Sequence, residues 1–168
     1  MIAKTTWKVG GNTGSNIGDA VPKTAYANEI TSPIPTSTST TGETEYTARI
    51  GLMYVSDYGF AASPNTWTDK LYHDDRTNNL YLYWYEIYKS VNWMAIGSNE
   101  WTISRKSDNA YSVFCVESDG SVGSCNAKAA LAVRPVFYLV SSATYSSGDG
   151  TYENPIRLGD YTVPFEVN

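Results

Sequence analysis

The chain has 168 residues, of which 42% are hydrophobic and 17% charged, and its formal net charge is −5. This composition supplies enough apolar side chains for one folded domain over residues 1–168 and argues against a disordered chain. The acidic balance disfavours a nucleic-acid partner, because phosphate binding requires a basic field. The 14 Tyr and 5 Trp, against only 4 Phe, suit half-buried strands and recognition surfaces.

No apolar run approaches the roughly 20 residues of a membrane helix, so we expect no membrane insertion by this segment. The first residues also lack the apolar stretch of a secretory signal. A composition rich in Ser, Thr, Tyr and Asn favours part of a longer exported chain over a cytoplasmic protein. The expected location is therefore extracellular, or at a cell or virion surface.

The N-terminal half predicts short elements between long loops. Alternating apolar residues predict the strands, while Ser63 as a cap and Pro64 at the first position predict a helix start. The glycine-rich loop has no Gly-Lys-Ser/Thr and therefore is not a phosphate loop. In chain order we expect a strand at 5–9, a glycine-rich loop at 10–18, a helical turn at 25–30, a Ser/Thr/Pro-rich loop at 31–44, a strand at 46–55, a helix start at 63–67 and a strand or short helix at 80–91.

The C-terminal half predicts a β-sheet. The sequence Ser118-Asp-Gly120 is typical of a hairpin turn, because Asp-Gly supplies the positive φ angles of a tight turn. Pro135 restricts its segment to a sheet edge or the start of a strand. In chain order we expect strands at 93–96, 101–104, 113–117, 121–123 and 132–140, and then a turn at 146–151.

Two interleaved sets of residues occupy the region between Trp101 and Leu139. Phe114 and Val116 are two positions apart and share one face of a strand, so Cys115 and Glu117 are expected on the other, exposed face. A loop at 123–131, on a rigid sheet, would extend this exposed row, which is the usual geometry of recognition. The fixed skeleton, which can build a sheet, is predicted to be Trp101, Ile103, Phe114, Val116, Gly120, Val122, Val133, Pro135, Phe137 and Leu139. The candidate ligand-binding residues are Tyr111, Ser112, Cys115, Glu117, Asp119, Ser121, Gly123, Ser124, Cys125, Asn126, Lys128, Ala129 and Leu131.

Several of these segments resemble the C-type-lectin-fold variable proteins of diversity-generating retroelements. The resemblance lies in Trp101-Thr-Ile-Ser-Arg, in Phe114-x-Val-x-Ser-x-Gly-x-Val122 and in Ala132-Val-Arg-Pro-Val-Phe-Tyr-Leu139, and residues 46–63 and 148–155 fit the same group. It implies an α+β, β-rich, C-type-lectin-like fold with short strands, one or two short helices and long irregular loops. It also implies a variable region at about 105–131, rimmed by residues 104–109, whose exposed side chains are diversified to change the target.

We therefore predict a non-enzymatic domain of receptor or adhesin type, from a bacterium or phage, that needs no cofactor and binds a protein or a surface glycan. One alternative is a constant structural or adhesive module of a bacterial surface appendage. Another is a relative of the formylglycine-generating copper oxidases, which share this fold and use paired cysteines. Cys115 and Cys125 are the only cysteines; a disulfide fits an exported chain, but two free thiols are favoured.

Other polar residues receive structural interpretations. His73, Asp74 and Asp75 are read as a polar turn, because no fourth ligand falls at a metal-site spacing. No metal is predicted, calcium included. Glu86 and Glu100 sit in aromatic-rich stretches and would suit a glycosidase acid pair, although surface positions are the default. Arg134 is expected to point inward and pair with Glu153 or Asp149.

Overall fold

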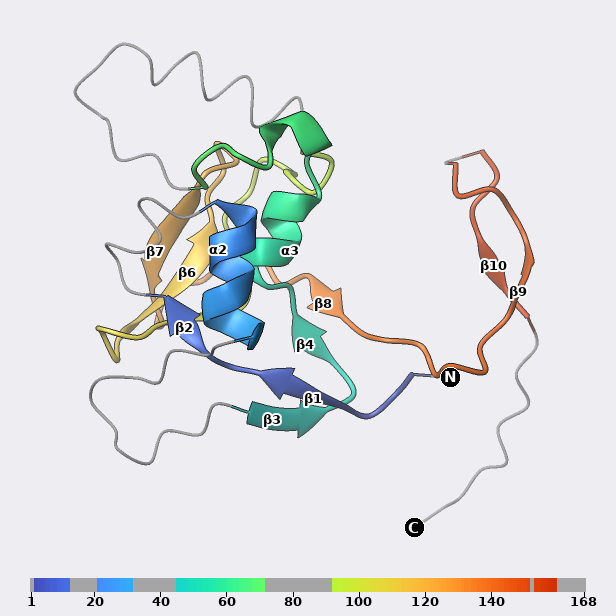
Figure 1. The fold of residues 1–168 in the computed structure, drawn as a ribbon, viewed down its shortest axis with the longest axis horizontal. Helices are drawn as coiled ribbons and strands as arrows, with labels where there is room; N and C mark the ends of the chain where they lie inside the picture. Colours follow the sequence, from blue (N-terminus) through green and yellow to red (C-terminus); the bar gives the residue numbers. More distant parts are fainter. Residues whose placement is uncertain (1, 13–20, 32–44, 72–91, 152, 160–168) are drawn as a thin grey trace.

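The computed structural model describes residues 2–12, 21–31, 45–71, 92–151 and 153–159. The described chain is a β-rich α+β structure with short helices (Figure 1), the coarse class that the sequence predicts. Its strands are β1 (Thr5–Lys8), β2 (Gly11–Asn12), β3 (Glu45–Ala48), β4 (Gly51–Leu52), β5 (Glu100–Lys106), β6 (Ser112–Val116), β7 (Val122–Asn126), β8 (Pro135–Val136), β9 (Tyr145–Ser147) and β10 (Arg157–Leu158). Its helical segments are α2 (Pro22–Tyr26), the π-helical turn η1 (Ala27–Thr31), α3 (Val55–Phe60) and the 3-10 turn η2 (Pro64–Thr66).

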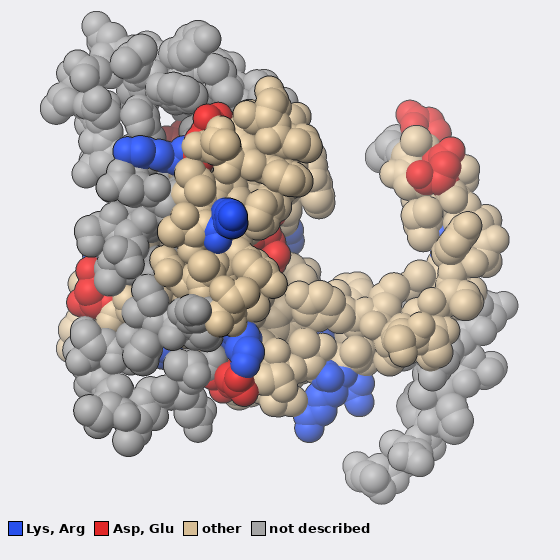
Figure 2. Space-filling view, in the orientation of Figure 1, with Lys and Arg blue, Asp and Glu red and all other residues tan. Residues whose placement is uncertain are grey.

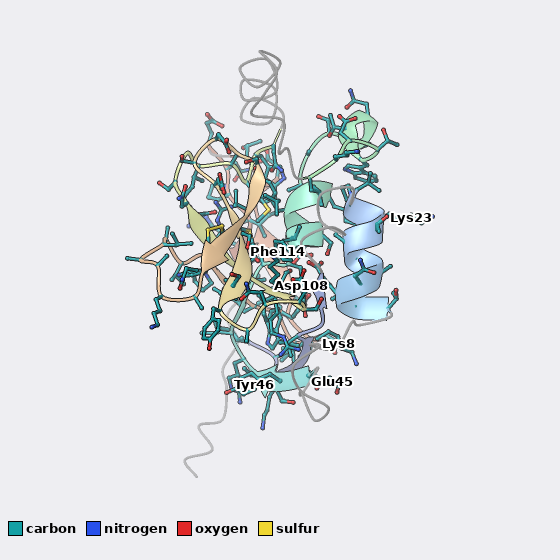
Figure 3. The ribbon with its side chains drawn as sticks, turned by 90° about the vertical axis from the view of Figure 1, so that its left-hand side faces the viewer. Lys8, Lys23, Glu45, Tyr46, Asp108 and Phe114 are labelled. Atoms are coloured by element: carbon teal, nitrogen blue, oxygen red, sulfur yellow. A yellow bond between two sulfur atoms is a disulfide. The ribbon has the colours of Figure 1, made fainter. Side chains whose placement is uncertain are left out.

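The largest sheet has four strands in the order β2-β5-β6-β7. β2 runs parallel to β5, and the β5-β6 and β6-β7 pairs are antiparallel. Three two-stranded sheets accompany it, in which β1 pairs with β3, β4 with β8 and β9 with β10, all antiparallel. Across the first of these, Lys8 forms an ion pair with Glu45 (Figure 3).

The main core lies between the four-stranded sheet and the helices α2 and α3. Figure 3 shows Phe114 at this interface, with the sheet on one side and the helices on the other. The buried side chains that meet there come from both the helices and the sheet, which makes these layers one packed unit. They are Ala25, Met53, Val55, Tyr58, Leu71, Met94, Phe114, Val116 and Val122.

A second packed site holds the small sheets against the body. Trp7 is buried, and its indole Nε1 donates to the Ala48 carbonyl at 3.1 Å. The ring lies so close to Gly51 that a Cβ built there would approach its carbons to 2.8 Å. Tyr138 stacks on Trp7 with ring centroids 5.3 Å apart. Gly51 is therefore required by the close approach of the indole.

A buried carboxylate ties three elements together. Glu29, in η1, accepts hydrogen bonds from Ser104 Oγ of β5 and from the Ser56 amide of α3 at 3.2 Å. Ser104 Oγ also accepts from the Val55 amide at 3.0 Å. Burial raises the pKa of Glu29 from 4.5 to about 7, more than these hydrogen bonds lower it. The carboxyl is thus partly protonated at neutral pH.

The C-terminal part of the described chain extends away from the body. Leu139 bridges to Ile2, the Ala3 amide donates to the Tyr138 carbonyl at 2.8 Å, and the β9-β10 hairpin stands apart beyond this contact (Figure 1). Val133, Pro135, Phe137 and Leu139 are exposed, Val133 to 65%. The strand expected at 132–140 is therefore reduced to β8, which pairs with β4 over only two residues, and these four residues do not form one continuous strand of the sheet.

Other expectations differ at particular elements. The strand expected at 46–55 is divided into β3 and β4, which pair with different partners, and its end begins α3, which the sequence analysis did not predict. Residues 92–95 form a turn instead of a strand, closed by the Ala95 amide on the Asn92 carbonyl at 3.0 Å. The expectations for 13–18, 32–44 and 72–91 fall outside the described residues.

Charged residues are scattered on the face that Figure 2 shows, and no broad basic patch forms among the coloured side chains. None of the helices in the described part of the chain has the length and apolar composition needed to cross a bilayer.

Phe114→Ala should destabilise the domain by about 3 to 5 kcal/mol, because it removes a fully buried aromatic ring from the main core. Ser124→Ala, at the exposed position paired with Phe114 across β6 and β7, is the matched control and should change stability by less than about 0.5 kcal/mol. Urea denaturation measures both values. Equal losses would contradict the assignment of core and surface.

Glu29→Gln should remove a pH dependence from the stability of the fold. A raised folded-state pKa means that the contribution of Glu29 is complete below pH 4.5 and declines as the pH rises through about 7. The wild type should therefore lose about 3 kcal/mol relative to Glu29→Gln over this interval, since the amide is neutral throughout. Unfolding free energies of both proteins, measured across that pH range, test this. A constant difference would show that Glu29 does not titrate there.

Candidate ligand-binding surface

The predicted site is centred on the β6-β7 hairpin, whose register is fixed by its turn and its core. Phe114 lies opposite Ser124 and Val116 opposite Val122. The Glu117 amide donates to the Ser121 carbonyl at 2.8 Å, and Gly120 has a φ of 85°, so only the glycine of the Asp-Gly pair takes the positive φ. The Tyr58 hydroxyl donates to the Gly120 carbonyl at 2.6 Å, which anchors this turn to α3.

The two cysteines form a disulfide across this hairpin. Cys115 lies opposite Gly123 and Cys125 opposite Val113, so the bond runs diagonally between β6 and β7 with a Cα–Cα distance of 5.9 Å. The expectation of two free thiols is wrong. Whether the two cysteines can form a disulfide depends on the register of β6 and β7. The spacing of the cysteines in the sequence does not reveal this register.

The candidate residues do not share one exposed face. Ser112, Ser124 and Asn126 project on the side of Phe114 near the edge of the sheet, whereas Cys115 and Gly123 project on the other side. Both Cys115 and Gly123 are buried, so the prediction that they are exposed binding residues is wrong.

Two contacts cover these buried positions. The disulfide partner Cys125 packs on Cys115. The carboxylate end of the Glu117 side chain lies over Gly123, and a Cβ at Gly123 would require this flexible side chain to move. Cys115 and Cys125 therefore belong to the framework of the hairpin, and Gly123 is buried next to Cys115.

One end of the hairpin carries most of the exposed candidates, and we call residues 108–111 and 126–129 the Tyr111 end. Tyr111 is 75% exposed. The Ala127 amide donates to the Tyr111 carbonyl at 2.9 Å, which joins the two segments. Asn109 Oδ1 accepts from the Tyr111 amide and Asn126 Oδ1 from the Lys128 amide, each at 2.9 Å. These bonds order a surface made of Asp108, Asn109, Ala110, Tyr111, Asn126, Ala127, Lys128 and Ala129, all exposed.

The rim predicted at residues 104–109 is smaller than expected. Ser104 is buried and bonded to Glu29, and Ser107 is buried as well, so only Asp108 and Asn109 are exposed within that range. Asn126 lies within β7, so the strand runs three residues further than predicted, and the loop expected from residue 123 begins after it. Leu131 is half-buried.

The remaining candidates lie at the opposite end of the hairpin. Glu117, Asp119 and Ser121 are half-buried in the turn. Asp119 Oδ1 accepts from the Ser121 amide at 2.9 Å and from its hydroxyl at 2.6 Å, so both side chains stabilise the turn itself. The five residues of β6 separate the two ends by roughly 15 Å. The predicted surface is thus divided, and the Tyr111 end is its accessible part.

Arg134 points inward, as the sequence predicts, but its partner is neither Glu153 nor Asp149. Its Nη2 donates to Glu100 Oε2 at 2.8 Å and to the Met94 carbonyl at 2.7 Å. Glu100 is only 2% exposed, so it is a structural partner of Arg134 and not a surface residue. Asp149 instead accepts hydrogen bonds from Thr151, which lower the pKa of its carboxyl.

A cavity of about 420 Å³ lies next to Arg134 and was not predicted. Asp57 from α3, Trp93 from the turn at 92–95, and the segment from Arg134 to Tyr138 line it. Reduced hydration raises the pKa of Asp57, and burial together with Asp57 raises that of Tyr138. The lining comes from segments far apart in the sequence, so no local pattern indicates the cavity.

His73, Asp74, Asp75 and Glu86 lie outside the described residues. Within the described ranges no three side chains of His, Cys, Asp or Glu cluster as metal ligands would. Comparisons of the chain with protein families, with curated proteins and with solved structures gave no match.

Arg134→Ala should destabilise the fold by about 3 kcal/mol, because it leaves the Glu100 carboxylate buried without its cation. Adding Glu100→Gln to Arg134→Ala should recover part of this loss, since a neutral amide is less costly to bury. Urea denaturation of the single and double variants provides the comparison. A double variant less stable than Arg134→Ala would show that the buried charge is not the cause.

Proposed function

We propose that this chain is a non-enzymatic ligand-binding domain of receptor or adhesin type, with the Tyr111 end as its contact surface. The observation that carries the proposal is a rigid hairpin that presents chemically unrelated, exposed side chains. An aromatic residue of the kind enriched at binding hot spots, Tyr111, stands among small and polar residues that adapt to a partner. The partner would be a protein or a surface glycan.

Rigidity supports this use of the hairpin. The Cys115–Cys125 bond, the backbone hydrogen bond from Ala127 to Tyr111 and the Asn109 side-chain bond fix the backbone behind Tyr111. A preorganised surface loses less conformational entropy on binding, which leaves more of the contact energy as affinity.

We further propose that the fold is C-type-lectin-like and that a retroelement diversifies this surface. The small, mostly antiparallel four-stranded sheet with two helices on one side supports the first part. The separation of framework from exposed positions fits the second. Under this proposal Tyr111, Ser124, Asn126, Lys128 and Ala129 vary, whereas Cys115, Gly123 and Cys125 do not.

The disulfide supports an extracellular or surface location, because such bonds persist in oxidising compartments. It also weakens the copper-oxidase alternative, since sulfur atoms joined to each other are not thiolate ligands. The constant adhesive module remains a competing function, and it predicts the same fold with an unchanging Tyr111 end.

Sequencing the coding segment for residues 105–131 in clonal relatives separates the two functions. A diversified receptor should show substitutions at the exposed positions of the Tyr111 end, together with a reverse-transcriptase gene and a near-copy of this segment close by. Phe114, Val116, Val122 and both cysteines should stay constant. The half-buried turn residues Asp119 and Ser121 are the matched internal control and should vary less.

An identical Tyr111 end in all relatives would favour the constant module. Substitutions spread equally over core and surface codons would contradict both. A second measurement concerns the framework: mild reduction of the disulfide should lower the unfolding free energy by about 2 to 4 kcal/mol, while simultaneous replacement of Tyr111 and Lys128 by Ala should leave it almost unchanged.

A further inference from the structure

The cavity beside Arg134 lies between α3, the turn at 92–95 and residues 134–138, and none of its lining residues belongs to the hairpin. It is large enough for a small ligand. Its sides are mainly apolar, with Met53 and Met94 among them, and two charged side chains reach it. The β4-β8 pair, next to α3 in Figure 1, holds one side of the cavity in place.

An exposed indole forms part of the cavity wall. Trp93 is 78% exposed, although Trp is usually among the well-buried residues. The backbone turn that carries Trp93 is fixed, because Asn92 Nδ2 donates to the Tyr58 carbonyl at 2.7 Å and Asn92 Oδ1 accepts from the Met94 amide at 3.0 Å. Phe137 and Tyr138 add two more half-exposed rings. The fold thus holds aromatic surface open to solvent.

The polar atoms in the cavity have unused hydrogen-bonding capacity. Asp57 Oδ2 accepts from the Tyr54 amide at 3.0 Å, and Oδ1 accepts no hydrogen bond within the described residues. Arg134 uses Nη2 for Glu100 and the Met94 carbonyl, while its Nη1 and Nε have no partner in the same part of the chain. The cavity therefore combines an acceptor-only carboxylate with a donor-only guanidinium.

The geometry points to a neutral sugar ring as the ligand of this cavity. A sugar hydroxyl both donates and accepts, so the hydroxyls of one ring can donate to Asp57 and accept from Arg134, while the apolar face of the ring packs on an aromatic side chain. A cationic ligand would meet the permanently charged guanidinium, and an anionic ligand would meet the carboxylate. Neutral polyhydroxyl chemistry avoids both penalties.

This site shares no residue with the Tyr111 end, so the two proposals are independent. The experiment uses the oxidised chain in EDTA, with the Trp93 indole N–H signal followed by NMR. The probes are the methyl glycosides of glucose, galactose, mannose and N-acetylglucosamine, each titrated to about 100 mM. At least one should shift the Trp93 signal saturably, with a Kd on the order of 1 mM.

Variants identify the groups responsible. Trp93→Ala should weaken binding by about tenfold through the lost ring contact, followed by signals of the sugar itself. Asp57→Asn keeps an acceptor for the Tyr54 amide and should weaken binding by about tenfold, because the charge-assisted hydrogen bond is lost. Trp67→Ala is the matched control: Trp67 packs on Phe60 with ring centroids 5.1 Å apart, outside the cavity, and its removal should leave sugar affinity unchanged.

The assignment is overturned if none of the four glycosides shifts the Trp93 signal. It is equally overturned if Trp93→Ala binds as tightly as the wild type, or if choline chloride or inorganic phosphate saturates the cavity and the sugars do not. Tyr111→Ala must leave the titration unaltered, and a loss there would move the sugar site to the hairpin and refute the cavity assignment.

Discussion

The arrangement of the cavity and of the sheet beside it depends on one guanidinium. Arg134 donates through a single nitrogen to the buried Glu100 at the start of β5 and to the Met94 carbonyl in the turn that carries Trp93. It thereby joins three parts of the chain that the β4-β8 pair, only two residues long, would hold weakly. Because Glu100 is buried, its negative charge requires a cationic partner. The same Arg134 nitrogen binds the Met94 carbonyl, so the ion pair also positions the turn at 92–95. This ion pair acts together with the packing of Met53, Met94 and Val136 in ordering this side of the molecule.

The sequence was informative where local chemistry decides the structure. Alternation placed Phe114, Val116 and Val122 in the core, and Asp119-Gly120 located the hairpin turn, because both features depend on residues close in the chain. The sequence was uninformative where contacts between segments far apart in the chain determine the structure. The partner of Arg134 lies 34 residues away, and the burial of Cys115 follows from a strand register. Val133 and Phe137 have the apolar side chains of core residues, yet both remain largely exposed, Val133 to 65% and Phe137 to 48%.

The candidate site shows the same division. The exposure of Tyr111, Lys128 and Ala129 could be predicted from the sequence, because they interrupt every periodic pattern, which is typical of exposed loops. Gly123 and the cysteines interrupt the pattern for another reason, since they form the hairpin itself. Chemical diversity along a strand therefore does not separate a binding residue from a framework residue. Only the pairing register does so, and the cavity at Trp93 had no sequence signal at all.

The disulfide has a consequence for how such a surface tolerates change. A strand that slips by one residue turns every side chain to the opposite side, and β7 is an edge strand with only β6 as its neighbour in the sheet. A covalent link between Cys115 and Cys125 permits a single alignment of the two strands, whatever side chains occupy the positions between and beyond them. Substitutions at the Tyr111 end would then change the chemistry of the contact surface without changing the backbone conformation of the hairpin. The disulfide thus makes the backbone conformation of the hairpin independent of which side chains occupy its exposed positions.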